Sequence, residues 1–572
     1  MKNNESIIIV GSGITALVSA LKAVERGMAV TLISKSPDTR TGPTDQLFQS
    51  STHDGSYNRY ITSTEGHPYL DLDGYITQMY PDIASDFEKT IAEGGMLALP
   101  VEEFSPETQL FLQKRKAINQ AIKTDKGAWL QHEQLFKEYV AENICSMKLW
   151  YEELAQFLTE APELAQELSL SVGIHRFYDE KNLFEGARKT LFSQGMIKAS
   201  FYNDEAVINP EFSTYRAGIE KGAFIKGGAL SMHGLAFNIK AVTRFILGRL
   251  EKAGVRFLLG PTHEVTEVLY DPSDRVEGLI TRDGTVHVAR HFLFHGGAYL
   301  QPGLFKGANA DQHLCGMKGF WAHITGKTAE KLIRGMGLTP KASKIHGGKM
   351  PVTVDGETYL SQVADLNVQP VVLEKENGET EYILCIGSGY LFVGTYPFEG
   401  DTDVPKNYTQ SKERIRAIQK SERLAVAGFW EVVKRVYDID ISLDDCLARK
   451  HADVKILAKG CIRSWSVDDQ ELRLVQKTLQ GGVMLVHGGG NTGSTTKSMF
   501  ESEVAMQFIA EIDTADPVGD LAKHYEDVRK SLRSDADKLN TESWLYLEEV
   551  LNAALFSFAE PGPVLTSHKP SF

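Results

Sequence analysis

The sequence predicts an α/β fold. A Rossmann-like dinucleotide-binding domain is built from discontinuous segments, and it is joined by a substrate domain of α+β type on a mixed sheet and by a helical insertion. Three observations predict this. Residues 6–34 show the order strand, glycine turn, helix and strand; α/β character returns over residues 225–300; and residues 480–512 again show strand, glycine-rich turn and helix. A parallel sheet whose strands come from distant segments satisfies all three.

The first unit is the clearest. A continuous apolar run over Ile7–Val10 is typical of a buried parallel strand. Helical spacing over residues 17–24 ends near Gly27, a common helix stop, and Ala29–Ile33 is a second buried run. Together they predict a βαβ unit.

The middle of the chain is less regular. Residues 36–75 are rich in Ser, Thr, Gly, Asp and Pro and predict a long loop, while residues 77–200 carry largely helical periodicity. Asp283-Gly284 predicts a hairpin turn, residues 305–400 alternate as strands do, and residues 409–437 predict a helix. The expected organisation is a first segment of the Rossmann-like domain at 1–75, a largely helical insertion or cap at 76–210, a second Rossmann-like segment at 211–304, a β-rich substrate domain at 305–455, a closing Rossmann-like segment at 456–515 and a helical tail at 516–572.

Composition excludes several classes of protein. The formal charge of −14 disfavours binding to nucleic acid or to an anionic membrane surface, because both require clustered Lys and Arg. Five scattered cysteines without a CxxC pair predict neither a metal site nor a disulfide framework. No apolar run reaches the length of a membrane span or of a signal-peptide core, so a cytoplasmic location is expected.

The segment Gly11-Ser12-Gly13-Ile14-Thr15-Ala16 follows a strand and opens a helix. Its first glycine allows the tight turn, its second lets the backbone approach a pyrophosphate, and Ala16 meets the need for a small residue where helix and strand pack. The helix N-terminus then offers N–H groups to phosphates. The alternative is a plain βα turn without a ligand.

The second strand ends in Ser34-Lys35, where an acidic residue usually binds the adenosine ribose. The Ser34 hydroxyl can still bond a ribose hydroxyl. Lys35 instead suggests a 2′-phosphate and hence NADP, against which the rest of the chain argues.

Later segments resemble motifs of one family, the FAD-dependent oxidoreductases related to D-amino-acid oxidase, sarcosine oxidase and glycine oxidase. The resembling segments are Leu250–Val255, Val276–Gly284, His295–Tyr299, Met317–Phe320, Gly460–Arg463 and His487–Thr496. The resemblance implies FAD as cofactor. Further cofactor contacts implied in this way are Val265 at the adenine, Gly296 and Gly297 over the nucleotide, and Gly489, Gly490, Asn491, Thr492, Gly493, Ser494 and Thr495 at the flavin pyrimidine ring. The helical stretch over 105–200 has no counterpart in the small members.

Five residues are candidates on the substrate side. His53 lies in the long loop and either attaches FAD covalently or bonds local backbone. Arg59 is a candidate for bidentate binding of a substrate carboxylate, with a structural salt bridge as the alternative. The resemblance implies that Arg463 either holds the carboxylate of an amino acid or contacts the flavin. Lys318 is a candidate cation for oxygen activation or a surface lysine, and His487 either polarises flavin or substrate or packs locally.

Flavin accepts a hydride equivalent from a carbon that bears nitrogen or oxygen. The sequence therefore predicts oxidation of a C–N bond of a small-molecule amine or amino acid to an imine, with O2 as acceptor. One alternative is a dehydrogenase of a hydroxy acid or related substrate that uses quinone or another acceptor. A second is an accessory flavoprotein that binds a partner protein through the helical insertion. An NADPH-dependent monooxygenase is disfavoured because no second glycine fingerprint occurs.

Overall fold

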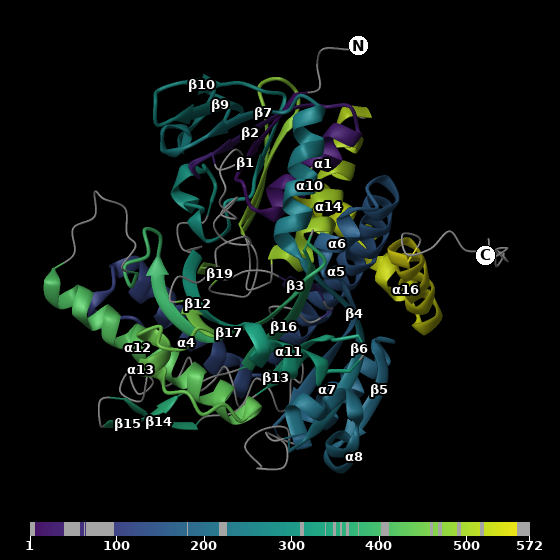
Figure 1. Ribbon diagram of the computed structural model, residues 1–572. Coiled ribbons are helices and arrows are strands. Elements are labelled where there is room, and N and C mark those ends of the chain that lie inside the picture. The colour runs from purple at the N-terminus through teal and green to yellow at the C-terminus, as the bar shows by residue number, and fades with distance from the viewer. Residues whose placement is uncertain are drawn as a thin grey trace, which may run out of the picture.

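Two sheets of different kind organise the chain in a computed structural model (Figure 1). The structure describes residues 6–38, 58–61, 63, 97–179, 181–216, 226–308, 314–337, 339–346, 350–354, 357–361, 365–375, 377–401, 411–457, 462–466, 472–488, 494–514 and 520–556.

The first sheet is the predicted parallel one. Its order is β20-β21-β11-β1-β2-β7, and every neighbouring pair is parallel except β20 with β21. The strand bounds are Ser6–Val10 (β1), Ala29–Ser34 (β2), Arg256–Leu259 (β7), His291–Phe294 (β11), Leu472–Lys477 (β20) and Val483–Gly488 (β21). The continuous apolar runs are explained because both faces are covered. Helices pack on one face, and a three-stranded sheet, β8-β9-β10, covers the other.

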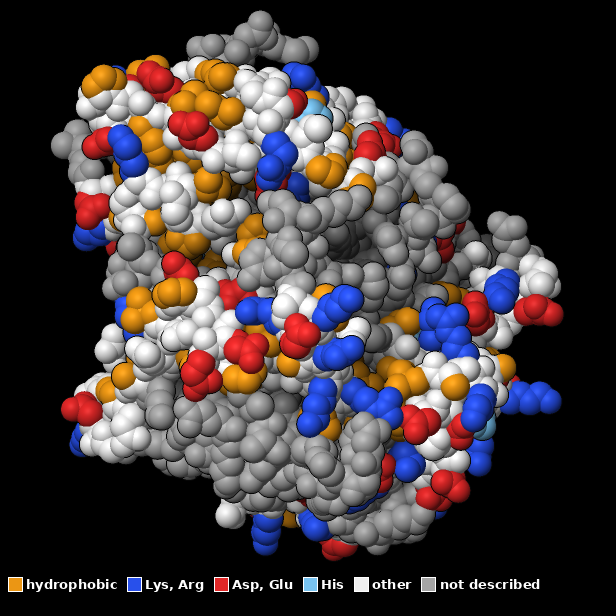
Figure 2. Space-filling view, turned by 90° about the vertical axis from the view of Figure 1, so that its left-hand side faces the viewer, with side chains coloured by type: hydrophobic (Ala, Val, Ile, Leu, Met, Phe, Trp, Pro, Cys, Tyr) orange, Lys and Arg blue, Asp and Glu red, His pale blue; other side chains and the backbone are white. Residues whose placement is uncertain are grey.

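The three-stranded sheet confirms the predicted hairpin. Its strands are Val265–Tyr270 (β8), Val276–Thr281 (β9) and Val286–His287 (β10), and Asp283-Gly284 lies in the turn between β9 and β10. Figure 2 shows the side of the molecule that is on the left in Figure 1, where basic and acidic side chains are interspersed.

The second sheet is larger and mixed, with ten strands among the described residues. Its path is β18-β12-β17-β16-β13-β4-β6-β3; β19 also pairs with β12, and β5 with β6. The bounds are Asn58–Ile61 (β3), Ser171–Tyr178 (β4), Ile197–Tyr202 (β5), Gly228–Asn238 (β6), Leu314–Ile324 (β12), Ala342–His346 (β13), Asp365–Glu374 (β16), Thr380–Thr395 (β17), Val454–Leu457 (β18) and Ile462–Ser466 (β19).

This sheet departs from the expected organisation. Strands β4 and β5 lie within the stretch 76–210 that the sequence predicts to be largely helical, and β3 and β6 lie in segments assigned to the Rossmann-like domain. A strand is stabilised by partners far away in the sequence, so the sequence of a short strand between amphipathic helices does little to predict it. Residues 387–389 lie within one continuous strand, β17.

The helix α5 is the main element of the predicted insertion. It spans Lys126–Glu160, and the Asp125 side chain caps it by accepting the N–H of Ala128 at 2.8 Å. It packs against α14, which packs against α1, so α5 belongs to the helical layer over the parallel sheet (Figure 1). The buried Trp150 side chain lies at the centre of this contact and donates to the Thr495 carbonyl at 2.9 Å.

The remaining elements complete the two layers. The α-helices are Ile14–Glu25 (α1), Pro106–Thr124 (α4), Leu164–Leu168 (α6), Lys181–Ser193 (α7), Asn203–Ile208 (α8), Ile239–Lys252 (α10), Gly326–Arg334 (α11), Lys412–Tyr437 (α12), Leu443–Leu447 (α13), Ser494–Thr514 (α14), Leu521–Arg533 (α15) and Thr541–Phe556 (α16). The 3-10 turns are Val101–Glu103 (η1), Pro210–Tyr215 (η2), Pro261–His263 (η3), Gly297–Tyr299 (η4), Pro302–Leu304 (η5) and Ser534–Lys538 (η6), and a separate hairpin joins Met350–Val354 (β14) to Glu357–Ser361 (β15).

None of the helices in the described ranges is long and apolar enough to cross a membrane. Within the same ranges no three His, Cys, Asp or Glu side chains are grouped as metal ligands.

Candidate functional site

The carboxyl ends of the parallel strands meet at one edge of the first sheet. From β1 the chain proceeds to β2 on one side, while β11 lies on the other, which makes the end of β1 a topological switch point. Ligands of open α/β sheets bind in the crevice at such a point. The Gly11 N–H donates to Ile33 at 2.9 Å and the His295 N–H donates to Val10 at 2.8 Å, so the loops after all three strands are tied together there.

Gly11 is required by this geometry. Its φ is +125°, and a Cβ at this position would lie 2.5 Å from the carbonyl oxygen of His295. Gly13 is the N-cap of α1 and supplies no side-chain cap, while the fully buried Ala16 packs against Gly11. The helix therefore presents its N-terminus to the crevice without a capping side chain from Gly13, as the binding of an anionic group requires.

Ser34 ends β2 at the position expected for the ribose contact. Its hydroxyl lies 2.8 Å from the hydroxyl of Ser12, and both side chains are buried. The two hydroxyls thus form one polar surface next to the glycine turn. Their contact with a ribose stays a prediction.

Lys35 is engaged by aromatic rings. Its Nζ lies 4.5 Å from the ring centroid of Tyr299 and 3.9 Å from that of Tyr396, and 3.8 Å from a carboxylate oxygen of Glu264. Burial lowers the pKa of Lys35 to about 8. The Lys35 ammonium group is thus held by two aromatic rings and a carboxylate, and its contact with the nucleotide stays a prediction.

The lowered pKa of Lys35 gives a pH-dependent prediction. Between about pH 8 and the ordinary lysine pKa of about 10.4, the unfolded chain binds more protons than the folded one, so stability gains from Lys35 as pH rises. We expect the Lys35→Met variant to lack this gain in chemical denaturation across that range. The control is Lys306→Met, which removes an exposed lysine that lies over the ring of Tyr270. Parallel pH profiles of wild type and Lys35→Met would contradict the assignment.

The glycines predicted to lie over the nucleotide also reach the edge of the parallel sheet where the crevice lies. Gly297 has a φ of +54° and begins η4, directly after β11, and a Cβ on Gly296 would lie 3.0 Å from that of Leu300. Val265 begins β8 and is buried in the core between the parallel sheet and the three-stranded sheet. Their contacts with FAD stay predictions.

The closing segment arrives at the same edge from the far end of the chain. Strand β21 ends at Gly488, α14 begins at Ser494, and Gly489–Gly493 lie outside the described residues. Thr495 is buried in the first turn of α14.

The structure separates the substrate-side candidates. His53 and the side chain of Arg59 lie outside the described residues, although the Arg59 backbone pairs with Phe237 in the second sheet. Arg463 is half-buried on β19, which packs beside η4 and so brings this arginine's strand to the crevice. Lys318 lies on the neighbouring strand β12.

Lys318 and His487 are both held by carboxylates. The Lys318 ammonium is buried between Asp401 at 2.9 Å and Glu422 at 2.6 Å. His487 lies 3.1 Å from a carboxylate oxygen of Glu501. The alternative of a surface lysine is thus wrong for Lys318, while oxygen activation stays a prediction. The contact of His487 with Glu501 supports a packing role.

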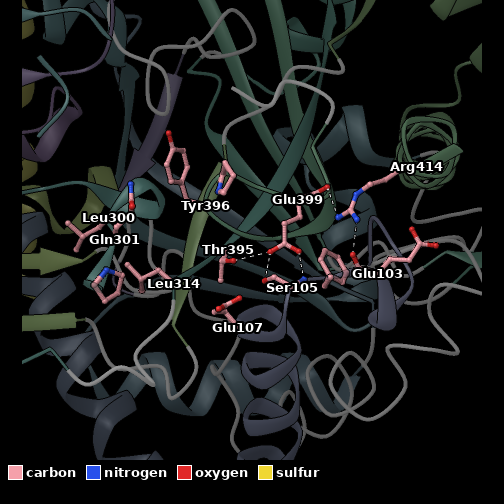
Figure 3. A pocket seen from close by; sticks show the side chains of 13 residues that line it. Glu103, Ser105, Glu107, Leu300, Gln301, Leu314, Thr395, Tyr396, Glu399 and Arg414 are labelled. Atoms are coloured by element: carbon pink, nitrogen blue, oxygen red, sulfur yellow. Dashed lines mark hydrogen bonds between the residues drawn. The ribbon is translucent and has the colours of Figure 1, made fainter. Parts of the chain in front are cut away.

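A pocket of about 430 Å³ opens beside the crevice (Figure 3). The sequence alone did not predict it. Its lining includes Glu103, Glu107, Leu300, Tyr396, Glu399 and Arg414. The lining residue Leu300 also packs against the Gly296 and Gly488 positions, which joins the pocket to the edge of the parallel sheet. These residues come from segments far apart in the chain, so no local motif signals them.

Glu399 organises the wall of this pocket. Its carboxylate accepts from the backbone N–H of Ser105 at 2.6 Å and from the hydroxyls of Ser105, Thr108 and Thr395 at 2.7 to 3.1 Å. The exposed side chains of Glu103 and Glu107 also line the pocket, so its charge is predominantly acidic.

The fold and the crevice define a dinucleotide-binding α/β protein. The family model for FAD dependent oxidoreductase matches residues 6–496, and the chain belongs to this family, with FAD as its cofactor. No curated protein sequence matches significantly.

Similar solved structures include a thermally stable mutant of fructosyl peptide oxidase, 15% identical over 91% of this chain and 95% of that chain, with a TM-score of 0.45. Glycine oxidase from Bacillus cereus is 14% identical over 89% of this chain and 95% of that one, with a TM-score of 0.45. L-proline dehydrogenase from P. horikoshii is 11% identical over 89% and 94%, with a TM-score of 0.41.

Proposed function

We propose that the protein oxidises a C–N bond of an amine or amino acid to an imine, with O2 as electron acceptor. The observation that carries this proposal is the acidic pocket beside the crevice, where Glu103 and Glu107 favour a cationic substrate. The sequence resemblance to amine-oxidising enzymes supports the same chemistry.

In this proposal the residues of the chain bind and orient the cofactor and the substrate. The turn at Gly11 and the N-terminus of α1 would hold the FAD pyrophosphate, and the Ser34 hydroxyl would meet the ribose. When bound, FAD supplies the two-electron acceptor. Arg463 would hold a substrate carboxylate bidentately. The amine must be neutral when the hydride leaves, so the ammonium proton would pass to water beside the exposed Glu103 and Glu107 side chains before transfer.

The direct test is anaerobic mixing of the holoenzyme with a panel of amines, amino acids and hydroxy acids. We expect an amine or amino acid to bleach the oxidised-flavin absorbance, and air to restore it with release of peroxide. Bleaching by hydroxy acids alone, with turnover on a quinone and without peroxide, would instead support the dehydrogenase. If no compound of the panel reduces the flavin, the result would support the alternative of an accessory flavoprotein.

The acidic pocket is tested with the Glu107→Gln variant. We expect the KM for a cationic substrate to rise about two- to fivefold with little change in kcat, because the lost attraction of an exposed carboxylate acts on binding alone. The matched control is Glu102→Gln, which changes an exposed neighbour of Glu103 that does not line the pocket. Equal KM values for the two variants would remove the pocket from the proposal.

A further inference from the structure

A cluster of buried charges lies behind the first turns of α14. We call Glu142, Lys497, Glu501 and Arg529 the buried charge cluster; each is at most 3% exposed. Arg529 donates to both oxygens of Glu501, at 2.5 and 2.9 Å, and lies 2.9 Å from Glu142, which in turn accepts from Lys497 at 2.8 Å. Three helices therefore meet in one ionic contact: α5 supplies Glu142, α14 supplies Lys497 and Glu501, and α15 supplies Arg529.

The cluster is connected to the crevice edge. Glu501 holds His487, which precedes the last residue of β21, and the ring of His487 lies 5.9 Å from that of His295 at the end of β11. His295 lies 2.9 Å from the Ser19 hydroxyl on α1. Burial and the neighbouring His487 lower the pKa of His295 to about 3. The polar contacts thus run from the insertion helix to the ends of two strands of the parallel sheet.

The members of the cluster hold each other in their charged forms. Burial alone would raise the pKa of Glu142, but Arg529 and Lys497 beside it lower that pKa overall. Burial opposes the charge on Arg529, and Glu142 and Glu501 raise its pKa well above the ordinary value. Charges in this environment are weakly screened and act over longer distances than surface charges. Lys497 is the fourth residue of α14, within one helical turn of the end that carries the closing motif.

We propose that the buried charge cluster sets the reduction potential of the bound FAD, and that Glu142, supplied by the helical insertion, acts as a positioning residue that keeps this potential low. Reduced flavin carries added negative charge, so a negative charge behind α14 disfavours reduction and a positive charge favours it. The inference rests on FAD binding at this crevice. It holds whatever the substrate, because the potential belongs to the cofactor.

The test compares the potential of the holoenzyme in two variants of opposite sign, each equilibrated with a reference dye. Glu142→Gln removes one negative charge, and we expect at least a threefold shift toward reduced flavin. Lys497→Met removes one positive charge from the same pair, and we expect at least a threefold shift toward oxidised flavin. Both variants lose the same salt bridge, so a purely structural role would move thermal stability in both without reversing the sign of the potential shift.

Glu138→Gln is the matched control. Glu138 lies one turn earlier on α5, is 33% exposed and pairs with Arg533, so we expect it to leave the potential unchanged. Should Lys497→Met lose FAD, Arg473→Gln takes its place; Arg473 lies 3.9 Å from Glu142 and is 26% exposed. The proposal is overturned if Glu142→Gln and the variant that removes a positive charge shift the ratio of reduced to oxidised flavin in the same direction, or if both shifts are below threefold.

Discussion

The Gly13→Asp variant is expected to fold and to lose FAD. Gly13 has a φ of −74° and a ψ of 173°, which any residue adopts, and an aspartate at this N-cap is among the preferred residues. A carboxylate at the helix N-terminus, however, occupies the position of the pyrophosphate and repels it. Two like charges about 4 Å apart repel by about 4 kcal/mol at an effective dielectric constant of about 20, which corresponds to roughly a thousandfold loss of affinity.

The measurement is the FAD content of the purified variant, followed by titration of the apoprotein with FAD. Gly13→Asn controls for size without charge and is expected to lose less affinity. A Gly13→Asp protein with normal flavin content would show that the crevice at α1 does not hold the cofactor.

The Arg529→Met variant is expected to lose about 3–5 kcal/mol of unfolding free energy, the usual cost when one partner of a buried ion pair is removed. Arg529 is fully buried, and its loss leaves Glu501 and Glu142 without their shared partner in a site that water does not reach. Chemical denaturation followed by tryptophan fluorescence measures the change.

Lys523→Met provides the comparison on the same helix. Lys523 and Asp527 form an exposed i, i+4 pair, and such pairs contribute little, so this variant is expected to unfold like the wild type. An Arg529→Met protein as stable as Lys523→Met would mean that the buried charge cluster relaxes without cost.

The parallel sheet was predictable because its signals are local. The apolar run before Gly11 and the glycine turn each follow from a few consecutive residues, and both were confirmed as β1 and the turn into α1. The helix expected over 409–437 is α12, Lys412–Tyr437. Periodicity and turn chemistry suffice for elements of this kind.

The mixed sheet and the buried charge cluster were not predictable for the opposite reason. Strand β4 pairs with β6, at least 50 residues away in the chain, and with β13, more than 160 residues away, and nothing within Ser171–Tyr178 encodes either partner. Glu142 is one of many charges in an amphipathic helix, and only the fold distinguishes it from its exposed neighbours. For the same reason Glu399 and Arg414 could not be assigned to a pocket in advance.

The order of strands in the parallel sheet has a consequence for biosynthesis. Strands β1 and β2 leave the ribosome first, but their sheet is complete only when β21 and α14 follow, more than 440 residues later. At typical rates of about 5–20 residues per second, this interval is on the order of a minute. Strand β1 gains its neighbour β11 about midway through this interval, but β11 itself stays without its own neighbour β21 until the end of it. A chain that terminates before α14 would leave the ribosome without a complete cofactor crevice.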